Sequence, residues 1–372
     1  MAESEYFGLP APSISDMWKE AVSDGRPILI YGMGNGADKL CERLSSLGVS
    51  ASDFFASDGF VRGQSFRGHR VLTYSEAKEK YGDFIVMLGF GSPRSDVIAG
   101  FERIDREVKF FVPDMPVSGE EYFDADFYKR NFSRIERVYS SLADETSRRI
   151  YSGIVRYKLT GSLGTLLSAS CGRQERWGLF DTGSIITAVD AGAYTGDTAS
   201  EMLGEFSGVK QIYAIEPDPK TFKKLQKFAA EEGECKINAV RGAAWSSPGV
   251  SGFSSCGNRN SFLKFDCRAG VAEVPLVTID EICGGRAEYI KYDVEGAERE
   301  ALLGSAETIK NCRPVISVSA YHRSEDIFSL AELAGELYGG GYRLYVRRPA
   351  CVPAWDIEFI FVPDERSGSI RR

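Results

Sequence analysis

The sequence predicts an α/β protein with two Rossmann-like units. A chain of 372 residues is longer than one hydrophobic core usually serves, so two units are expected. Apolar runs of strand length alternate with helical segments near the start and again in the second half, which favours parallel sheets. Each alternating region also contains a glycine-rich turn directly after an apolar run, GMGNGA and DAGAYTG, which is typical of nucleotide-binding strand–turn–helix units.

Composition and charge narrow the functional classes. With 43% hydrophobic and 26% charged residues the chain resembles an ordinary globular protein, and a net charge of −8 argues against nucleic acid as the main partner. The eight cysteines form no CxxC pair, which favours reduced thiols over a disulfide framework or a zinc site. The first residues lack the apolar stretch of a signal peptide, and no run is long enough to span a membrane. We therefore expect a cytoplasmic protein.

Residues 25–116 are predicted to form a Rossmann-like accessory domain after an N-terminal extension, residues 1–24. Its strands are expected at 27–31, 53–56, 70–73 and 84–88, and a short helix over SEAKEKYG is expected to start at the serine and stop at the glycine. The unit is expected to end near VKFFVPDMP, where prolines interrupt the chain. Its turn offers Gly32, Gly34 and Gly36 to a nucleotide or sugar-nucleotide, but it lacks the third glycine of the full dinucleotide fingerprint. A purely structural or docking role is the alternative.

Residues 117–179 are predicted to be a helical linker or cap, because apolar and aromatic residues recur there at helical spacing. We expect these aromatic side chains to pack in the core. Residues 180–372 return to the strand–helix alternation, with strands expected at 185–190, 211–215, 237–241, 289–292 and 315–319 and a shorter one at 274–276. The last two β-rich runs, GYRLYVRRPA and DIEFIFVP, are predicted to pair as a hairpin.

The turn VDAGAYTGDT favours S-adenosylmethionine (SAM) over a dinucleotide. Gly192 and Gly196 allow the backbone to approach a ligand, and Glu216 ends the next predicted strand, where an acid can accept hydrogen bonds from a ribose. A dinucleotide would need GxGxxG, which places a helix N-terminus against a pyrophosphate. Here Asp190 precedes the glycines instead. An acid suits the ammonium and sulfonium of SAM and would repel a pyrophosphate.

Two further segments, KYDVEGAE and SAYHRSED, make the interpretation specific. Together with VDAGAYTGDT and IYAIEPDP they resemble, in the same order, the FkbM family of SAM-dependent methyltransferases over about residues 182–363. This resemblance implies a class I methyltransferase domain, whose seven-stranded, mostly parallel sheet has an antiparallel last strand. It also implies the cofactor-binding residues, which are Asp190, Gly192, Ala193 and Gly196 near the methionine end, Glu216 and Pro217 at the ribose, Ala243 and Trp245 near the adenine, and Asp293.

Trp245 suits either stacking on a base or ordinary core packing. For catalysis we expect His322 or Asp293 to act as the general base, Lys291 to orient or screen the acids, and Glu295 to position the acceptor or a cation. No metal-ligand geometry can be predicted, so metal dependence stays open, as does assembly into a homo-oligomer.

The resemblance implies methylation of a hydroxyl on a saccharide, a glycan precursor or a related metabolite. Two alternatives are a dinucleotide-dependent oxidoreductase that uses the N-terminal glycine turn, and a non-catalytic nucleotide-binding or scaffold protein.

Overall fold

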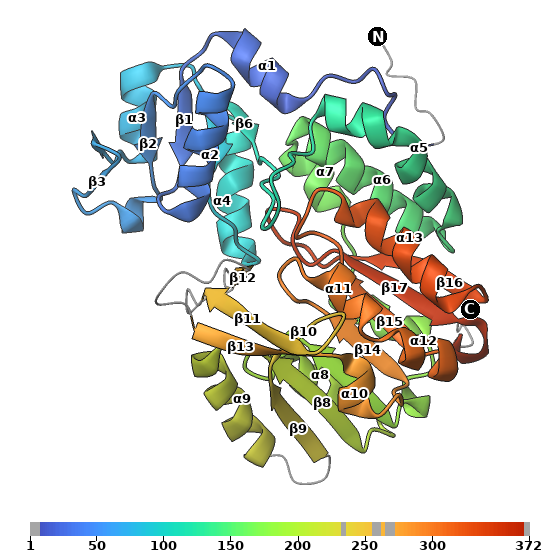
Figure 1. Ribbon diagram of the computed structural model, residues 1–372. Helices are drawn as coiled ribbons and strands as arrows, with labels where there is room; N and C mark the ends of the chain where they lie inside the picture. The colour runs from blue at the N-terminus through green and yellow to red at the C-terminus, as the bar shows by residue number, and fades with distance from the viewer. Residues whose placement is uncertain (1–7, 232–235, 255–261, 265–271, 368–372) are drawn as a thin grey trace.

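The computed structural model describes residues 8–231, 236–254, 262–264 and 272–367. Figure 1 shows two α/β regions joined by a group of helices, with the chain passing from blue at the upper left to the yellow and red elements below. The predicted α/β class is confirmed. Among the described residues, every helix is too short or too polar to cross a lipid bilayer.

The N-terminal unit is built on a four-stranded parallel sheet of order β2-β1-β5-β6. Its side chains alternate between two faces: Ile28 and Ile30 pack against helices α1 and α2, whereas Leu29 and Tyr31 face α3 and α4. The elements are α1 (Met17–Asp24), β1 (Ile28–Tyr31), α2 (Asn35–Ser46), β2 (Asp53–Phe55), a 3-10 turn (Asp58–Phe60), β3 (Ser65–Phe66), β4 (His69–Arg70), α3 (Tyr74–Tyr81), β5 (Ile85–Leu88), α4 (Ser95–Asp105) and β6 (Lys109–Phe111).

Two local expectations for this unit were wrong. Helix α3 starts at Tyr74 with Thr73 rather than the serine as its N-cap, because Thr73 and Glu76 form a reciprocal capping box, while Gly82 ends the helix as expected. The strand expected at 70–73 is reduced to His69–Arg70, which pairs with β3 in a separate hairpin. A fourth strand that was not predicted, β6, lies within VKFFVPDMP, the run near which the unit was expected to end.

A layer of helices follows, and its aromatic residues are largely buried, as expected. Phe127, Tyr128, Tyr151 and Tyr157 are each at most 2% exposed. The elements are α5 (Ala125–Ser141), α6 (Glu145–Thr160), α7 (Leu163–Ser168) and two 3-10 turns (Arg173–Leu179, Thr182–Ser184). In Figure 1 these helices lie beside the last two strands and α13, far along the chain.

The larger unit contains a seven-stranded sheet of order β16-β17-β15-β14-β7-β8-β9. Only β17, the last strand in the sequence, runs antiparallel to its neighbours β15 and β16. The predicted topology is therefore confirmed. Its elements are β7 (Thr187–Ala191), α8 (Asp197–Glu205), β8 (Gln211–Glu216), α9 (Pro219–Glu231), β9 (Lys236–Arg241), α10 (Ile279–Cys283), β14 (Tyr289–Tyr292), α11 (Glu298–Leu303), α12 (Ala306–Cys312), β15 (Val315–Ser319), α13 (Asp326–Tyr338), β16 (Tyr342–Arg347), β17 (Glu358–Pro363) and a final 3-10 turn (Asp364–Arg366).

A second, smaller sheet lies between β9 and α10 in the chain. It consists of β10 (Ala243–Ala244), β11 (Gly249–Ser254), β12 (Phe262–Lys264) and β13 (Ala272–Val277), in the order β10-β13-β11-β12. The short strand expected at 274–276 lies here. Figure 1 shows this sheet between the seven-stranded sheet and the N-terminal unit.

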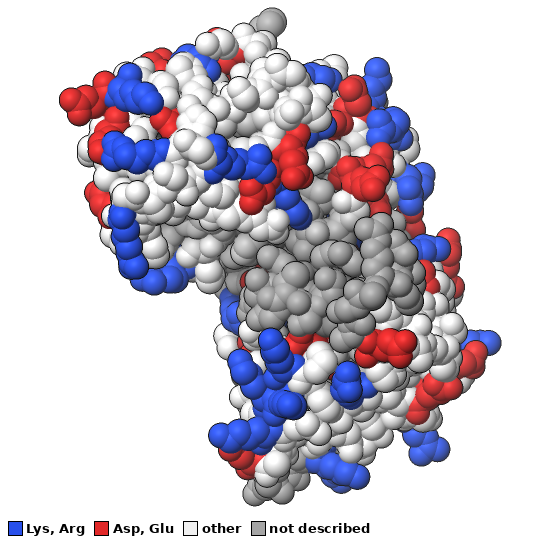
Figure 2. All heavy atoms as spheres, turned by 60° about the vertical axis from the view of Figure 1, so that its left-hand side comes forward, with Lys and Arg blue, Asp and Glu red and all other residues white. Residues whose placement is uncertain are grey.

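The surface carries charges of both signs. Figure 2 shows acidic and basic side chains interspersed over the upper part of one face and a group of basic side chains at its lower left. Helix α9 contributes four exposed lysines, Lys220, Lys223, Lys224 and Lys227.

Candidate active site

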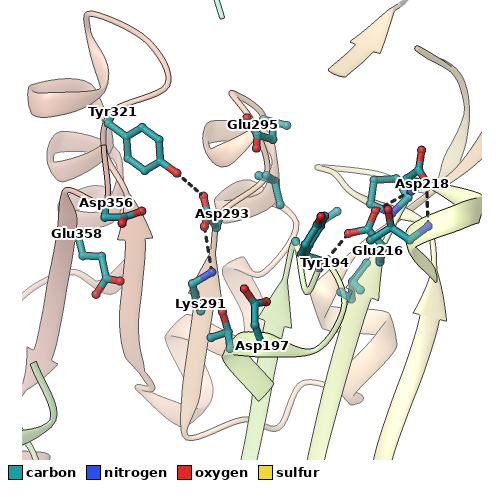
Figure 3. A pocket seen from close by; sticks show the side chains of 18 of the residues that line it. Tyr194, Asp197, Glu216, Asp218, Lys291, Asp293, Glu295, Tyr321, Asp356 and Glu358 are labelled. Carbon is teal, nitrogen blue, oxygen red and sulfur yellow. Dashed lines mark hydrogen bonds and ion pairs between the residues drawn. The ribbon is translucent and has the colours of Figure 1, made fainter. Parts of the chain in front are cut away.

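A cavity of about 270 Å³ opens where strands β7, β8 and β14 end. This is the carboxyl edge of a parallel sheet, where ligands of α/β proteins usually bind. Its lining comes mostly from the loops after these strands, with Tyr321 after β15, Arg173 and Arg176 from the helical layer, and Pro93 from the N-terminal unit. Figure 3 shows acidic side chains converging on this space from both sides.

The glycine turn after β7 is shaped by two close contacts. Gly192 has a φ of 87°, and a Cβ at this position would lie 1.9 Å from the carbonyl oxygen of Asp293. Gly196 has a φ of 97°, caps α8, and a Cβ there would lie 2.3 Å from the ring of Phe228. Because both positions need a left-handed backbone and leave no room for a side chain, only glycine fits. The turn therefore lies directly against the end of β14.

Asp190 is fully buried behind this turn. Neither of its carboxylate oxygens has a hydrogen-bond partner among the described residues, and the Nζ of Lys291 lies 3.8 Å from Oδ1. Burial raises the pKa of Asp190 to about 6 although Lys291 lowers it. Asp190 does not itself line the cavity, whereas its neighbours Gly192 and Lys291 do.

Glu216 stands at the end of β8 and faces the cavity beside Tyr194 and Asp218 (Figure 3). The backbone N–H of Tyr194 donates to its Oε2 at 3.0 Å, and that of Asp218 donates to its Oε1 at 2.8 Å. Burial raises the pKa of Glu216 to about 7, against the lowering effect of these two hydrogen bonds. The carboxylate is thus fixed in place by its own backbone and keeps lone pairs for a ligand. Pro217 also lines the cavity.

The loop after β14 contributes the second group of acids. Lys291 Nζ donates to Asp293 Oδ2 at 3.2 Å, and the Tyr321 hydroxyl donates to Asp293 Oδ1 at 3.2 Å (Figure 3). Burial alone would raise the pKa of Asp293, but the charges of Lys291 and His322 lower it to about 2. Glu295 also lines the cavity, and its backbone has a φ of 55°. Asp293 is therefore ionised at the cavity wall.

His322 is fully buried among acids and does not line the cavity. Its Nδ1 lies 2.8 Å from Glu298 Oε1, and its Nε2 lies 3.5 Å from Glu295 Oε2 and 3.6 Å from Asp293 Oδ1. Burial by itself lowers the pKa of His322, but these carboxylates, Glu298 most strongly, raise it to about 10. A histidine protonated at neutral pH cannot accept a proton, whereas the ionised carboxylate of Asp293 faces the cavity.

Of the remaining predicted cofactor-binding residues, only some line the cavity. Ala243 lines the cavity with its neighbours in the sequence, whereas Trp245 is not a lining residue, and its backbone N–H donates to Val277. Ala193 is buried in a small core cluster with Leu225 and does not line the cavity. Gly196 shapes the turn without lining the cavity.

Sequence reasoning missed several residues of the cavity wall: Pro93, Arg173, Arg176, Asp197, Tyr321, Asp356 and Glu358. Arg176 Nη1 donates to Glu358 Oε1 at 2.5 Å, although the two residues are 182 positions apart. Glu358 could have been singled out from the sequence, because it is the only acid in β17, a strand that is otherwise apolar. Nothing in the local sequence marks the two arginines as cavity residues.

The N-terminal glycine turn does not contribute to this cavity. A Cβ on Gly36 would lie 2.2 Å from the carbonyl oxygen of Gly89, and one on Gly32 would lie 2.8 Å from the ring of Phe90. Gly34 also has a left-handed φ, 118°, but open space around its Cβ position. Packing between the ends of β1 and β5 therefore requires glycine at two of the three positions, Gly32 and Gly36. These two glycines are explained without a bound ligand.

Part of the chain resembles known FkbM methyltransferases. Residues 190–344 match the family model of the methyltransferase FkbM domain, which confirms the predicted resemblance for this part of the chain. The solved structure of a methyltransferase FkbM from Methylobacillus flagellatus KT aligns with a TM-score of 0.68 and 18% identity, covering 97% of this chain and 96% of that one. The two chains therefore share their fold over nearly the whole length, including the N-terminal unit.

Two other solved structures match about half of this chain. A precorrin-6y C5,15-methyltransferase from Geobacter metallireducens covers 47% of this chain and 78% of its own, at 12% identity and a TM-score of 0.30. An rRNA methylase from Clostridium thermocellum, described as putative, covers 51% of this chain and 92% of its own, at 11% identity and a TM-score of 0.32. No curated protein sequence matches the chain significantly.

Proposed function

We propose that this protein is a methyltransferase that uses SAM to methylate a hydroxyl group, with a saccharide or a related polyhydroxylated metabolite as the acceptor. The observation that carries the proposal is the placement of Glu216 and Asp190 at the ends of neighbouring strands, on either side of a turn that only glycine can form. In the proposed site Glu216 accepts hydrogen bonds from the ribose hydroxyls, and Asp190 supplies negative charge beneath the methionine end.

The charge of the cavity supports a cationic cofactor. Seven acids line it, namely Asp197, Glu216, Asp218, Asp293, Glu295, Asp356 and Glu358, against three bases, Arg173, Arg176 and Lys291. Such an excess attracts an ammonium and a sulfonium and disfavours a pyrophosphate. The NAD-dependent alternative gains no support, because the N-terminal glycines are explained by packing and the site carries the wrong charge.

The proposed chemistry is a displacement in which bound SAM supplies an electrophilic methyl group. The role of the chain is to hold the acceptor oxygen in line and to exclude water, which can contribute on the order of 7–11 kcal/mol at best. Lys291 and Tyr321 hold the two oxygens of Asp293, so that this carboxylate has one orientation when it receives a hydrogen bond from the acceptor hydroxyl. Carboxylates that face the cavity from two sides suit an acceptor with several hydroxyl groups.

The N-terminal unit is proposed to be an accessory domain that completes the acceptor side of the cavity. Pro93 reaches the cavity from the loop after β5, and the adjacent Ser92 pairs by backbone hydrogen bonds with Val352 in the loop before β17. This contact makes the wall of the proposed site depend on both units.

Titration calorimetry with SAM and with NAD(H) tests the proposal. We expect SAM to bind with 1:1 stoichiometry and the isosteric change Asp190→Asn to weaken it at least tenfold, while NAD(H) does not bind. Transfer of label from methyl-labelled SAM to nucleotide sugars and free polyols then tests the acceptor class. Binding of NAD(H) without SAM would refute the proposal.

A further inference from the structure

The half of the cavity away from the proposed cofactor residues has an acidic wall of its own. The proposed cofactor residues stand at the ends of β7 and β8, whereas Tyr321 follows β15, and Asp356 and Glu358 lie just before and at the start of β17. Figure 3 shows these three side chains on the side of the cavity opposite Glu216. With SAM over β7 and β8, as proposed, the acceptor lies between Asp293 and this wall.

The arginines of this wall are already paired with acids. Arg176 Nη1 donates to Glu358 Oε1 at 2.5 Å, and both Arg173 and Arg176 form ion pairs with Glu201, which does not line the cavity. Two arginines are thus matched by two carboxylates. They leave no cation of this group for Asp356.

Two carboxylates of the wall keep lone pairs that the described part of the chain does not use. Glu358 is 7% exposed, and its Oε2 has no hydrogen-bond partner among the described residues. Asp356 lines the cavity with a φ of 57° and forms no ion pair with another described residue. Burial raises the pKa of Glu358 against the lowering effect of Arg176, and the charge of Asp356 adds to the rise. The two acids therefore repel each other, and a cation between them would relieve the repulsion.

Bound SAM does not supply that cation. Its ammonium, carboxylate and sulfonium together carry one positive charge, and in the proposed site they lie beside Asp190 and the turn after β7. The wall is separated from β7 by two strands, β14 and β15, in the order of the sheet. The compensating charge should therefore come from the acceptor.

We propose that Asp356 and the Oε2 of Glu358 bind a protonated amine of the acceptor, so that the acceptor is an amino sugar or another polyhydroxylated amine. A primary ammonium donates three hydrogen bonds, which suit two carboxylates and the hydroxyl oxygen of Tyr321. Hydrogen bonds of this charge-assisted kind are roughly twice as strong as neutral ones. The inference deepens the proposed function and rests on it.

The same wall determines which atom of such an acceptor receives the methyl group. Carboxylates keep an amine protonated, and a protonated nitrogen has no lone pair with which to attack. A hydroxyl of the acceptor instead faces Asp293, whose two oxygens are held by Lys291 and Tyr321. The bond from sulfur to the methyl carbon breaks, with its electrons left on sulfur, while the acceptor oxygen bonds to that carbon. The hydroxyl proton leaves by way of the Asp293 carboxylate, and the ammonium is unchanged.

Binding of matched sugars to the full chain, in the presence of saturating S-adenosylhomocysteine, tests the inference. Glucosamine and galactosamine are compared with glucose, galactose and the two N-acetylated amines by ligand-observed NMR titration at pH 7. The ring is the same within each set, and only the amines carry a positive charge. We expect each amine to bind at least about tenfold more tightly than its neutral counterparts. Equal affinities, or no binding of either amine, would overturn the inference.

Asp356→Asn tests the residue that is proposed to hold the amine. The change removes the charge with little change of shape, and asparagine tolerates the left-handed backbone of this position. The variant should lower the affinity for glucosamine to that for glucose. Asp364→Asn is the matched control, because Asp364 is exposed, lies outside the cavity and pairs with Arg343. This control should bind glucosamine as the wild type does. The sugar sets test the wild type by themselves if Asp356→Asn does not fold.

SAM titrations on the same proteins separate the possible failures. If Asp356→Asn weakens the binding of SAM and not that of glucosamine, the acids of the wall hold the ammonium of the cofactor and the inference is wrong. A protein that binds SAM but does not prefer the amines contradicts the amine site alone. A protein that prefers the amines but does not bind SAM contradicts only the proposed function.

Discussion

At the scale of single residues, Glu216 carries a pH dependence that can be measured. Burial raises its pKa to about 7, with the charges of Asp218 and Asp190 adding to the effect. A raised carboxyl pKa means that the free protein gains stability at low pH and loses it as the pH rises toward 7. An ionised carboxylate accepts stronger hydrogen bonds from ribose. SAM affinity should therefore fall below pH 7, by at most about tenfold per pH unit.

Calorimetric titration of SAM between pH 5.5 and 8.5 checks this expectation. Glu216→Gln should bind SAM weakly at every pH and lose the dependence around pH 7. If the SAM affinity of the wild type does not change with pH around pH 7, Glu216 does not bind the ligand.

Gly192 gives a second prediction at this scale. In Gly192→Ala the new Cβ would meet the Asp293 carbonyl oxygen at 1.9 Å, and the left-handed φ adds a cost of about 1–3 kcal/mol. The free energy of unfolding in urea should fall by at least that amount, and SAM binding should be lost. Gly204→Ala, in helix α8 with nothing near its Cβ position, should instead stabilise the protein by about 0.5–1 kcal/mol. If Gly192→Ala and Gly204→Ala change the free energy of unfolding equally, the close contact of Gly192 with the Asp293 carbonyl oxygen is contradicted.

At the scale of elements, a buried ion pair joins helix α6 to the segment after β6. Lys158 Nζ lies 2.5 Å from Asp114 Oδ2, and their side chains are 1% and 12% exposed. Lys158→Met leaves the acid without its partner and should lower the free energy of unfolding by about 3–5 kcal/mol, whereas the double change with Asp114→Leu should recover most of the loss.

The exposed pair of Lys19 and Asp126 serves as the comparison for that prediction. Its side chains are 55% and 70% exposed, so Lys19→Met should cost less than about 1 kcal/mol in chemical denaturation. If Lys19→Met lowers the free energy of unfolding more than Lys158→Met does, burial does not determine how much each ion pair contributes to stability.

The elements also show how far the sequence could predict the fold and the site. The strands of both main sheets follow from apolar runs, because a strand covered on both faces is apolar throughout. Asp190, Gly192 and Glu216 follow from their places at strand ends. The surroundings of His322 and the pair of Arg176 with Glu358 could not be predicted, since they depend on segments brought together only by folding. Thr73 displaced the expected serine cap through its capping box with Glu76, a competition that local sequence leaves undecided.

At the scale of the whole molecule, one hydrophobic cluster runs through both units. It includes Leu29 and Phe101 of the N-terminal unit, Tyr157 of the helical layer, and Ile290 and Phe359 of the seven-stranded sheet. A continuous core couples the unfolding of its parts. Scanning calorimetry should therefore give a single transition, which shifts as a whole to higher temperature when SAM is added.

A substitution where the two units meet should split the single unfolding transition into two. A Cβ on Gly91 would lie 2.5 Å from the ring of Trp355 and 2.8 Å from Pro353, so Gly91→Leu forces the loop after β5 away from the loop before β17. The N-terminal unit should then melt separately and earlier, without a shift on adding SAM. The same change at Gly100, in α4 with open space at its Cβ position, leaves the junction intact and should keep one transition. Two transitions in the wild type would mean that the units are only loosely joined, and that Pro93 does not form a fixed part of the cavity wall.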